Sequence, residues 1–277
     1  MKDQFFINNL MLQDFINLPW PKIFILFCIF YVFLLFIAWF FAGRALFPYP
    51  LEPSYSQDEV DFIVSTQGGM RIACFQVQSR NPNGLTILYS HGNGEDLGII
   101  RSHLEKISES GCNVISYDYP GYGLSSGDPT EDGCFESIDS VLSYMITDLG
   151  IKKDKIILWG RSLGSGPSCY LASQNIFAGI ILESPFLSAF RTVTEIPIIP
   201  WDYFQNIKFA KDINVPSLVI HGRWDEVVPF RHGKRLHNLL GGTKEFLQIK
   251  HASHNDLVQK GGSLYKETII SFINNLL

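Results

Sequence analysis

Several features that define common protein classes are missing from this chain of 277 residues. It has no cluster of Lys and Arg and a net charge of −5, which argues against nucleic acid as its main partner. Its five cysteines follow no Cys-x-x-Cys or Cys/His spacing, so we expect small buried side chains and predict neither a metal nor a cofactor. Internal repeats, low-complexity tracts and Asn-x-Ser/Thr glycosylation sites are also absent. What remains is a 46% hydrophobic chain, long enough to bury one large core.

The longest apolar run lies near the N-terminus, where every residue from Ile23 to Ala42 is apolar or aromatic. A helix needs about 20 such residues to cross a bilayer. Trp20 and Lys22 precede the run and Arg44 follows it, which is typical of the two membrane interfaces. A signal peptide is the less favoured alternative, because the run is too long and lacks a clean small-x-small cleavage site. An apolar core helix is the other alternative, and we predict a single-pass membrane anchor.

These boundaries divide the chain into four parts: an N-terminal segment (1–22), the anchor (23–43), a linker (44–57) rich in proline, and a large domain (58–277). The few charges that flank the anchor favour an N-terminus in the cytosol. The absence of a glycosylation site instead favours the cytosolic side for the large domain, and we give this second signal slightly more weight.

The large domain alternates strand-like and helix-like segments. The strand-like runs are 60–65, 71–78, 85–90, 113–117, 155–159, 179–182, 217–221 and 245–249, and the helical stretches are about 95–110, 131–149, 163–175, 232–240 and 255–276. Gly68-Gly69 predicts a hairpin turn between the first two strands. Interior runs such as Thr86–Tyr89 are almost continuously apolar, which is typical of strands buried on both faces. We therefore predict an α/β fold with a mostly parallel eight-stranded sheet flanked by helices.

The segment Gly160-Arg161-Ser162-Leu163-Gly164 joins the fifth of these strands to a helix. Glycines two residues before and after a serine predict a turn too tight for side chains at those positions. We expect a strained backbone at Ser162, a hydroxyl that stands clear of the sheet, and a helix N-terminus directed at it. Such a turn is the nucleophile elbow of a serine hydrolase, and an ordinary strand-to-helix connection is the alternative.

A serine becomes a nucleophile when a base takes its proton and an acceptor holds that base in one tautomer. Candidates for the base are His91, His251 and His254, and candidates for the acceptor are Asp225, Glu226 and Glu183. We favour His254, which lies in the loop after the last strand and immediately before a helix. We favour Asp225 as the acid, because it lies in a glycine-containing loop after the preceding strand. His91, at a strand end beside Gly92, is expected to brace its loop by hydrogen bonds.

An oxyanion hole needs two backbone N–H groups directed at the position where negative charge develops. We assign one to Leu163, at the start of the helix after the serine. We assign the other to Asn93, in the glycine-containing loop His91-Gly92-Asn93-Gly94 that follows the third strand. The loop 118–125 also follows a strand, and we expect it to be a structural turn.

Residues 185–211 interrupt the alternation with three prolines and many apolar side chains. Because this segment lies between two strands of the sheet, we predict a short cap over the strand ends that contacts an acyl chain, with Trp201 and Phe204 as the main contacts. Simple packing of the segment on the edge of the sheet is the alternative.

These motifs together resemble the α/β-hydrolase-domain proteins, and most of all the membrane-associated branch that includes acyl-protein thioesterases, the protein depalmitoylases. The resemblance covers about 51–277 and is carried by His91-Gly92-Asn93-Gly94, Asp118-Tyr119-Pro120-Gly121-Tyr122-Gly123, Gly160-Arg161-Ser162-Leu163-Gly164, Glu183-Ser184-Pro185-Phe186, His221-Gly222 with Asp225, and His254-Asn255. It implies Ser162 as nucleophile, Asp225 as acid and His254 as base. The depalmitoylases of this branch are tethered by a lipidated, cysteine-rich N-terminus, whereas this chain has an apolar helix there.

The sequence therefore predicts a membrane-anchored serine hydrolase that cleaves acyl thioesters or esters, with palmitoyl-protein as the favoured substrate. The expected partners are the lipid bilayer and an acylated protein or lipid ester. The nearest alternative is a monoacylglycerol or lysophospholipid lipase, and a peptidase is more remote. A non-catalytic membrane scaffold that kept the fold is the alternative from another class.

Overall fold

The computed structural model describes residues 19–48, 52–194 and 198–277. Most of the predicted N-terminal segment 1–22, residues 49–51 of the linker and residues 195–197 of the cap lie outside the described residues. The chain divides into two compact units, Met1–Ala45 and Leu46–Leu277.

All of the helix α2 (Trp20–Leu46) except its last residue lies in the first unit. Its stretch Trp20–Arg44, of 25 residues, is apolar and long enough to cross a membrane by length and composition. At 1.5 Å per residue such a helix is about 38 Å long, close to the thickness of a bilayer. Side chains along it, including Phe24, Leu26 and Phe27, are exposed, which is unlike the core helix of a soluble domain.

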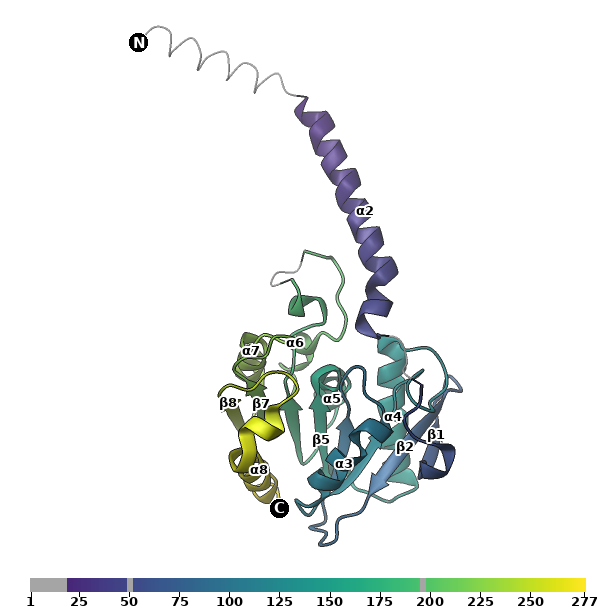
Figure 1. Ribbon diagram of the computed structural model, residues 1–277, viewed down its shortest axis with the longest axis vertical. Coiled ribbons are helices and arrows are strands. Elements are labelled where there is room, and N and C mark those ends of the chain that lie inside the picture. Colours follow the sequence, from purple (N-terminus) through teal and green to yellow (C-terminus); the bar gives the residue numbers. More distant parts are fainter. Residues whose placement is uncertain (1–18, 49–51, 195–197) are drawn as a thin grey trace, which may run out of the picture. The chain divides into compact units, whose positions relative to one another are not determined.

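The second unit is built on one sheet of eight strands in the order β1-β2-β4-β3-β5-β6-β7-β8 (Figure 1). The strands are β1 (Phe62–Ser65), β2 (Arg71–Val77), β3 (Thr86–Ser90), β4 (Asn113–Tyr117), β5 (Ile156–Arg161), β6 (Gly179–Glu183), β7 (Ser217–Gly222) and β8 (Lys244–Ile249). β2 pairs antiparallel with β1 and with β4, and the remaining pairs are parallel. The predicted α/β fold class, with its mostly parallel eight-stranded sheet, is confirmed.

Burial follows the position of each strand in the sheet. Every residue of β3, β6 and β7 is buried, whereas the edge strands β1 and β8 alternate between buried and exposed positions. The hairpin turn between β1 and β2 is made as predicted, with Gly69 at φ +83° and its N–H bonded to the carbonyl of Thr66. Four of the five cysteines, at positions 74, 112, 134 and 169, are free and buried, as expected.

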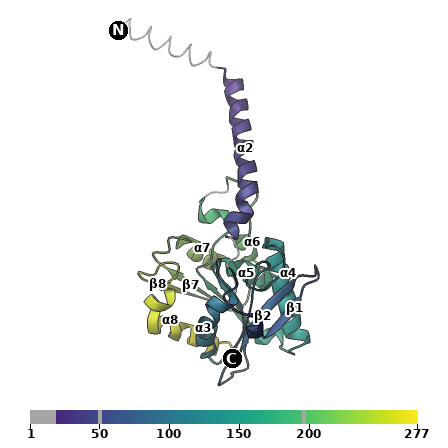
Figure 2. The same cartoon turned by 45° about the vertical axis from the view of Figure 1, so that its right-hand side comes forward.

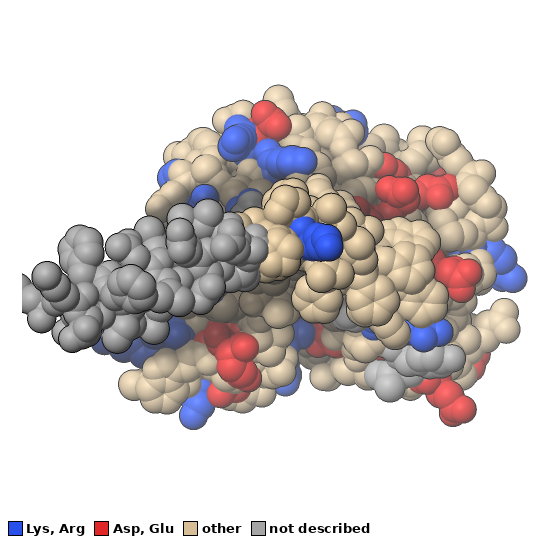
Figure 3. All heavy atoms as spheres, turned by 90° about the horizontal axis from the view of Figure 1, so that it is seen from above, with Lys and Arg blue, Asp and Glu red and all other residues tan. Residues whose placement is uncertain are grey.

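Helices cover both faces of the sheet, and Figure 2 separates the two layers. They are α3 (Leu97–Ser108), α4 (Glu131–Thr147), α5 (Ser165–Gln174), α6 (Asn206–Phe209), α7 (Arg231–Leu239) and α8 (Leu257–Asn274). α3 and α8 bury one core layer, and α4, α5, α6 and α7 bury the other. Over the face drawn in Figure 3, Lys and Arg side chains are interspersed with Asp and Glu side chains.

The helix starts follow from their capping residues. The side chain of Asp96 accepts the N–H of Ile99 at 3.0 Å at the start of α3, and Thr130 accepts the N–H of Gly133 at 3.0 Å at the start of α4. The four-residue helix α6 was not expected from the sequence. It is too short to show a helical period, and it lies in the irregular segment 185–211.

Candidate active site

The site forms at the turn between β5 and α5, where the sequence predicts the elbow. Ser162 has φ +49°, a left-handed backbone that is strained for any residue other than glycine. A Cβ at Gly160 would lie 2.4 Å from the carbonyl oxygen of Gly164, and a Cβ at Gly164 would lie 2.0 Å from that of Ser90. Both glycines are therefore required by close backbone contacts, and Ser162 occupies the strained position between them.

The first turn after Ser162 is supported from α6. The hydroxyl of Ser165 donates to the carbonyl oxygen of Ser162 at 2.6 Å, and the side-chain amide of Asn206 donates to that hydroxyl at 3.0 Å. The same amide donates to the carbonyl oxygen of Phe186 at 3.0 Å. Asn206 is fully buried, so the unexpected helix α6 holds the elbow in place.

A continuous hydrogen-bonded chain joins Ser162 to the two side chains that the sequence favoured. His254 Nε2 lies 2.9 Å from Ser162 Oγ, and His254 Nδ1 lies 2.8 Å from Asp225 Oδ2. All three residues are less than 10% exposed, at 9% for Ser162 and 7% for the other two. Because a carboxylate on Nδ1 fixes the tautomer of the imidazole, Nε2 is left as an acceptor for the serine proton.

The environment of Asp225 keeps its carboxylate charged. Burial by itself raises its pKa, but hydrogen bonds from His221, His254 and the N–H of Val228 outweigh burial, and the pKa lies well below its ordinary value. The N–H groups of Val227 and Val228 donate to Oδ1 at 3.0 and 2.7 Å, which leaves Oδ2 for His254. Asp225 is therefore an ionised acceptor with a fixed orientation.

The predicted oxyanion residues lie on two neighbouring turns. Leu163 is in the tight turn Ser162–Gly164, and Asn93 is in the loop after β3. These turns touch, because a Cβ at Gly164 would also lie 2.8 Å from the carbonyl oxygen of His91. The loop is held by Tyr119, whose hydroxyl donates to His91 O at 2.7 Å, and by Tyr122, whose hydroxyl donates to Asn93 Oδ1 at 2.7 Å.

Residues 86–203 match the family described as alpha/beta hydrolase fold. Alpha/beta hydrolase domain-containing protein 17B of Homo sapiens is 37% identical over 230 residues, 80% of this chain and 79% of that protein. The chain belongs to the α/β-hydrolase family. Alpha/beta hydrolase domain-containing protein aho-3 of Caenorhabditis elegans is 35% identical and covers 84% of this chain and 70% of its own. The esterase Pf2001 of Pyrococcus furiosus has the same fold, with a TM-score of 0.69, 15% identity, and coverage of 83% of this chain and 97% of its own.

The other candidate residues of this α/β hydrolase have different partners. His91 Nε2 lies 3.3 Å from Asp118, and its Nδ1 lies 2.8 Å from the carbonyl oxygen of Gly92, which agrees with the expected bracing role. His251 packs its ring against Trp224, and Glu226 is exposed. The carboxylate of Glu183 accepts the hydroxyl of Tyr265 at 2.8 Å.

Two residues at this site were assigned no role from the sequence, although both lie in the motifs that carry the resemblance. Arg161, between Gly160 and Ser162, directs its guanidinium to Glu95, to Glu183 and to Asn255, which follows His254. His221 lies 3.4 Å from the Asp225 carboxylate. The position of Arg161 inside the elbow was the available signal, but its partners lie 22 to 94 residues away and could not be paired without the fold.

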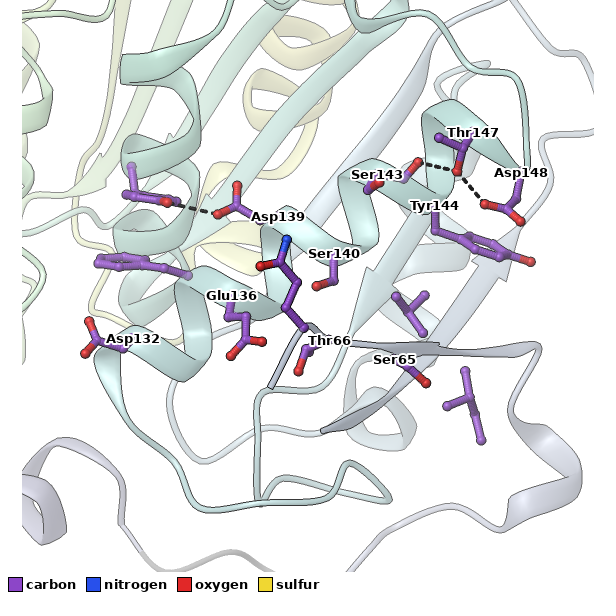
Figure 4. Close-up of a pocket in the computed structure, with 15 residues that line it drawn as sticks. Ser65, Thr66, Asp132, Glu136, Asp139, Ser140, Ser143, Tyr144, Thr147 and Asp148 are labelled. Atoms are coloured by element: carbon purple, nitrogen blue, oxygen red, sulfur yellow. Dashed lines mark hydrogen bonds between the residues drawn. The ribbon is translucent and has the colours of Figure 1, made fainter. Parts of the chain in front are cut away.

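The largest of the described cavities of this α/β hydrolase, about 900 Å³, is not at Ser162. It is an open groove between α4 and β1, and Figure 4 shows hydroxyl and carboxylate side chains such as Ser65, Glu136 and Asp139 along it. A smaller cavity of about 170 Å³ is lined by His254, Arg161 and Glu183. Within the described residues, no group of three or more His, Cys, Asp or Glu side chains is arranged to hold a metal ion.

Proposed function

We propose that this protein is a membrane-anchored serine hydrolase that cleaves acyl thioesters or esters, with a palmitoylated protein as its substrate. The observation that carries the proposal is the chain from Ser162 Oγ through His254 to Asp225, with distances of 2.9 and 2.8 Å. The strained elbow supports it, because strain at a serine is retained where the geometry of a nucleophile requires it. The motifs that resemble the acyl-protein thioesterases favour this substrate class, and the likeness to alpha/beta hydrolase domain-containing protein 17B supports the hydrolase fold.

In this mechanism Ser162 Oγ attacks the acyl carbon while His254 Nε2 takes the hydroxyl proton. The N–H groups of Leu163 and Asn93 donate to the oxyanion of the tetrahedral intermediate, and each such donor contributes roughly 3 kcal/mol. The carbon–sulfur bond then breaks, and the cysteine thiol leaves with the proton from His254. Water then attacks the acyl carbon of the acyl-serine while His254 Nε2 takes its proton. The bond from the acyl carbon to Ser162 Oγ breaks, Ser162 regains a proton from His254, and the fatty acid is released. A thiol with a pKa near 8.5 is a good leaving group, so this small site suffices.

The helix α2 serves in this proposal as the anchor, with the hydrolase domain on the cytosolic side. Tethering the domain to the membrane raises the effective concentration of lipid-modified substrates around Ser162. The segment 185–211 serves as the cap that contacts the acyl chain. A hydrogen bond of 2.9 Å from the N–H of Ala189 to the carbonyl oxygen of Tyr203 joins the two described parts of this segment, 185–194 and 198–211.

The test compares hydrolysis of palmitoyl-cysteine peptides, monoacylglycerols and lysophospholipids by the full chain and by Ser162→Ala. We expect preference for the thioester, and loss of both hydrolysis and fluorophosphonate labelling in the variant. A clear preference for glycerolipids would replace the thioesterase proposal with a lipase. Folded wild-type protein that takes up no fluorophosphonate would show a non-catalytic scaffold.

A further inference from the structure

Arg161 is a partly buried cation next to the nucleophile. Its side chain is 15% exposed, and those of its acidic partners Glu95 and Glu183 are 20% and 3% exposed. Burial lowers the pKa of a guanidinium, but the two carboxylates more than compensate and raise the pKa of Arg161 above its ordinary value. A charge that is held in this way, one residue before Ser162, has a fixed position relative to the elbow.

One side of the guanidinium reaches the loop that carries Asn93. Arg161 Nη1 donates to Glu95 Oε1, and Glu95 Oε2 accepts the N–H of Gly92 at 2.7 Å. The contact is close, since a Cβ at Gly92 would lie 2.8 Å from Glu95 Oε2 and 3.0 Å from Arg161 Nη1. Gly92 directly precedes Asn93, so this pair contacts the backbone immediately before the proposed oxyanion donor.

The other side of the guanidinium reaches the loop that carries His254. Arg161 Nη2 donates to Asn255 Oδ1 at 2.9 Å, and Asn255 directly follows His254. A third contact, 3.7 Å from Nε to Glu183 Oε1, connects the guanidinium to α8 through Tyr265, whose hydroxyl donates to Glu183 Oε2 at 2.8 Å. Two loops and the end of β6, which are far apart in the sequence, therefore meet on one side chain.

We propose that Arg161 is a positioning residue, which fixes the Asn93 loop and the His254 loop relative to Ser162. The inference rests on the proposed hydrolase function. A guanidinium suits this role because its planar fork presents several N–H groups in fixed directions, which the single ammonium of lysine cannot do. Misplacement of reacting groups by about 1 Å can cost roughly 100-fold in rate. The expected defect is therefore in kcat, with substrate binding largely retained.

The first test uses Arg161→Lys and Arg161→Ala in the full chain with the best substrate of the panel. We expect kcat to fall about 30-fold for lysine and about 100-fold for alanine, with KM within about threefold of wild type. Arg101→Gln is the matched control, because Arg101 forms a more exposed ion pair at 3.7 Å with Glu59, and its kcat should not change. Wild-type kcat in Arg161→Lys would overturn the proposal, because charge alone would then be sufficient.

Chemical rescue separates positioning from a structural role. The cavity beside Arg161 has about 170 Å³, enough space for a free guanidinium ion. Millimolar guanidinium should raise kcat of Arg161→Ala about tenfold and leave Ser162→Ala inactive, with the same concentration of sodium chloride as the salt control. If Arg161→Ala folds but guanidinium gives no rescue, the proposal is overturned.

The two arms of the guanidinium, which are its contacts with Glu95 and with Asn255, can also be removed one at a time. These variants test the proposal even if Arg161→Ala does not fold. Glu95→Gln and Asn255→Ala should each lower kcat about tenfold, and neither should add to the loss in Arg161→Lys. Fully additive losses would show that the arms act independently of Arg161 and would overturn the proposal. Wild-type protein without activity or fluorophosphonate labelling would reject the hydrolase function, whereas active wild type with unaffected Arg161 variants would reject only the positioning role.

Discussion

The elbow and the segment 185–211 are joined through Asn206 and Phe204 but differ in how closely the surrounding chain determines them. At the elbow, Gly160 and Gly164 have no space for a Cβ, and Ser162 is held in a strained conformation. In the other segment Val193 is 87% exposed, although Phe204 is fully buried against Gly166 and Phe135. The elbow therefore allows almost no substitution, whereas the exposed part of the segment has few contacts that a substitution would disturb.

The two residues of the cap that were predicted to contact the acyl chain, Trp201 and Phe204, differ in burial. A Cβ on Gly166 would lie 2.4 Å from the ring of Phe204, so Phe204 packs on the helix that follows the nucleophile. We therefore expect substitutions of Phe204 to act through the stability of the elbow. Trp201 is only half-buried and is the better probe of substrate contact.

The largest expected effect on activity concerns the hydrogen bonds that join Ser162, His254 and Asp225. Asp225→Asn should lower kcat about 10⁴-fold, because an amide does not hold His254 in the tautomer that accepts the serine proton. Steady-state hydrolysis measures the effect, and Glu226→Gln at the exposed neighbouring position is the control, with activity unchanged. Activity of Asp225→Asn within tenfold of wild type would show that a different group orients the base.

The second prediction concerns the backbone of the elbow. Gly164→Ala places a Cβ 2.0 Å from the carbonyl oxygen of Ser90, a contact that only a backbone shift relieves. We expect a loss of more than about 4 kcal/mol in the free energy of unfolding, measured by denaturant titration. Val193→Ala, in the exposed part of the other segment, should stay within about 0.5 kcal/mol of wild type. Equal effects of the two substitutions would show that the backbone at Gly164 is no more constrained than the exposed part of the segment 185–211.

The third prediction uses His232, which connects α7 to the start of the segment 185–211 by accepting the N–H of Leu187 at 3.2 Å. Burial, with the nearby charges of Arg231 and Arg191, lowers the pKa of His232 to about 4. The unfolded chain, with a histidine pKa near 6.5, therefore binds the proton first as the pH falls. This lowers the free energy of unfolding between about pH 6.5 and pH 4, by about 3 kcal/mol in total.

The measurement is the free energy of unfolding as a function of pH. His232→Asn keeps an acceptor for the Leu187 N–H but does not titrate, so its stability should fall less than that of wild type over this range. Parallel curves for the two proteins would mean that His232 titrates near its ordinary pKa in the fold.

The sequence predicted those parts of the molecule whose cause is local. All eight strands follow from short apolar runs between turn residues, and the contacts at Gly160 and Gly164 explain why the glycine spacing identifies the elbow. The helix α6 and the contacts of Arg161 were not predicted. Asn206 of α6 bonds to Ser165, and Arg161 bonds to Glu95 and Asn255, so both features involve long-range contacts that no periodicity reveals.

The smallest expected effect concerns Trp201, in the segment 185–211. If Trp201 contacts the acyl chain, Trp201→Ser should lower kcat/KM for palmitoyl substrates about tenfold and leave butyryl substrates within about twofold, since each apolar group lost from a pocket contributes about 1–3 kcal/mol. Val193→Ser, exposed in the same segment, is the matched control and should change neither. Equal losses for long and short chains would mean that Trp201 acts through the fold, and the cap would then share the structural role already assigned to Phe204.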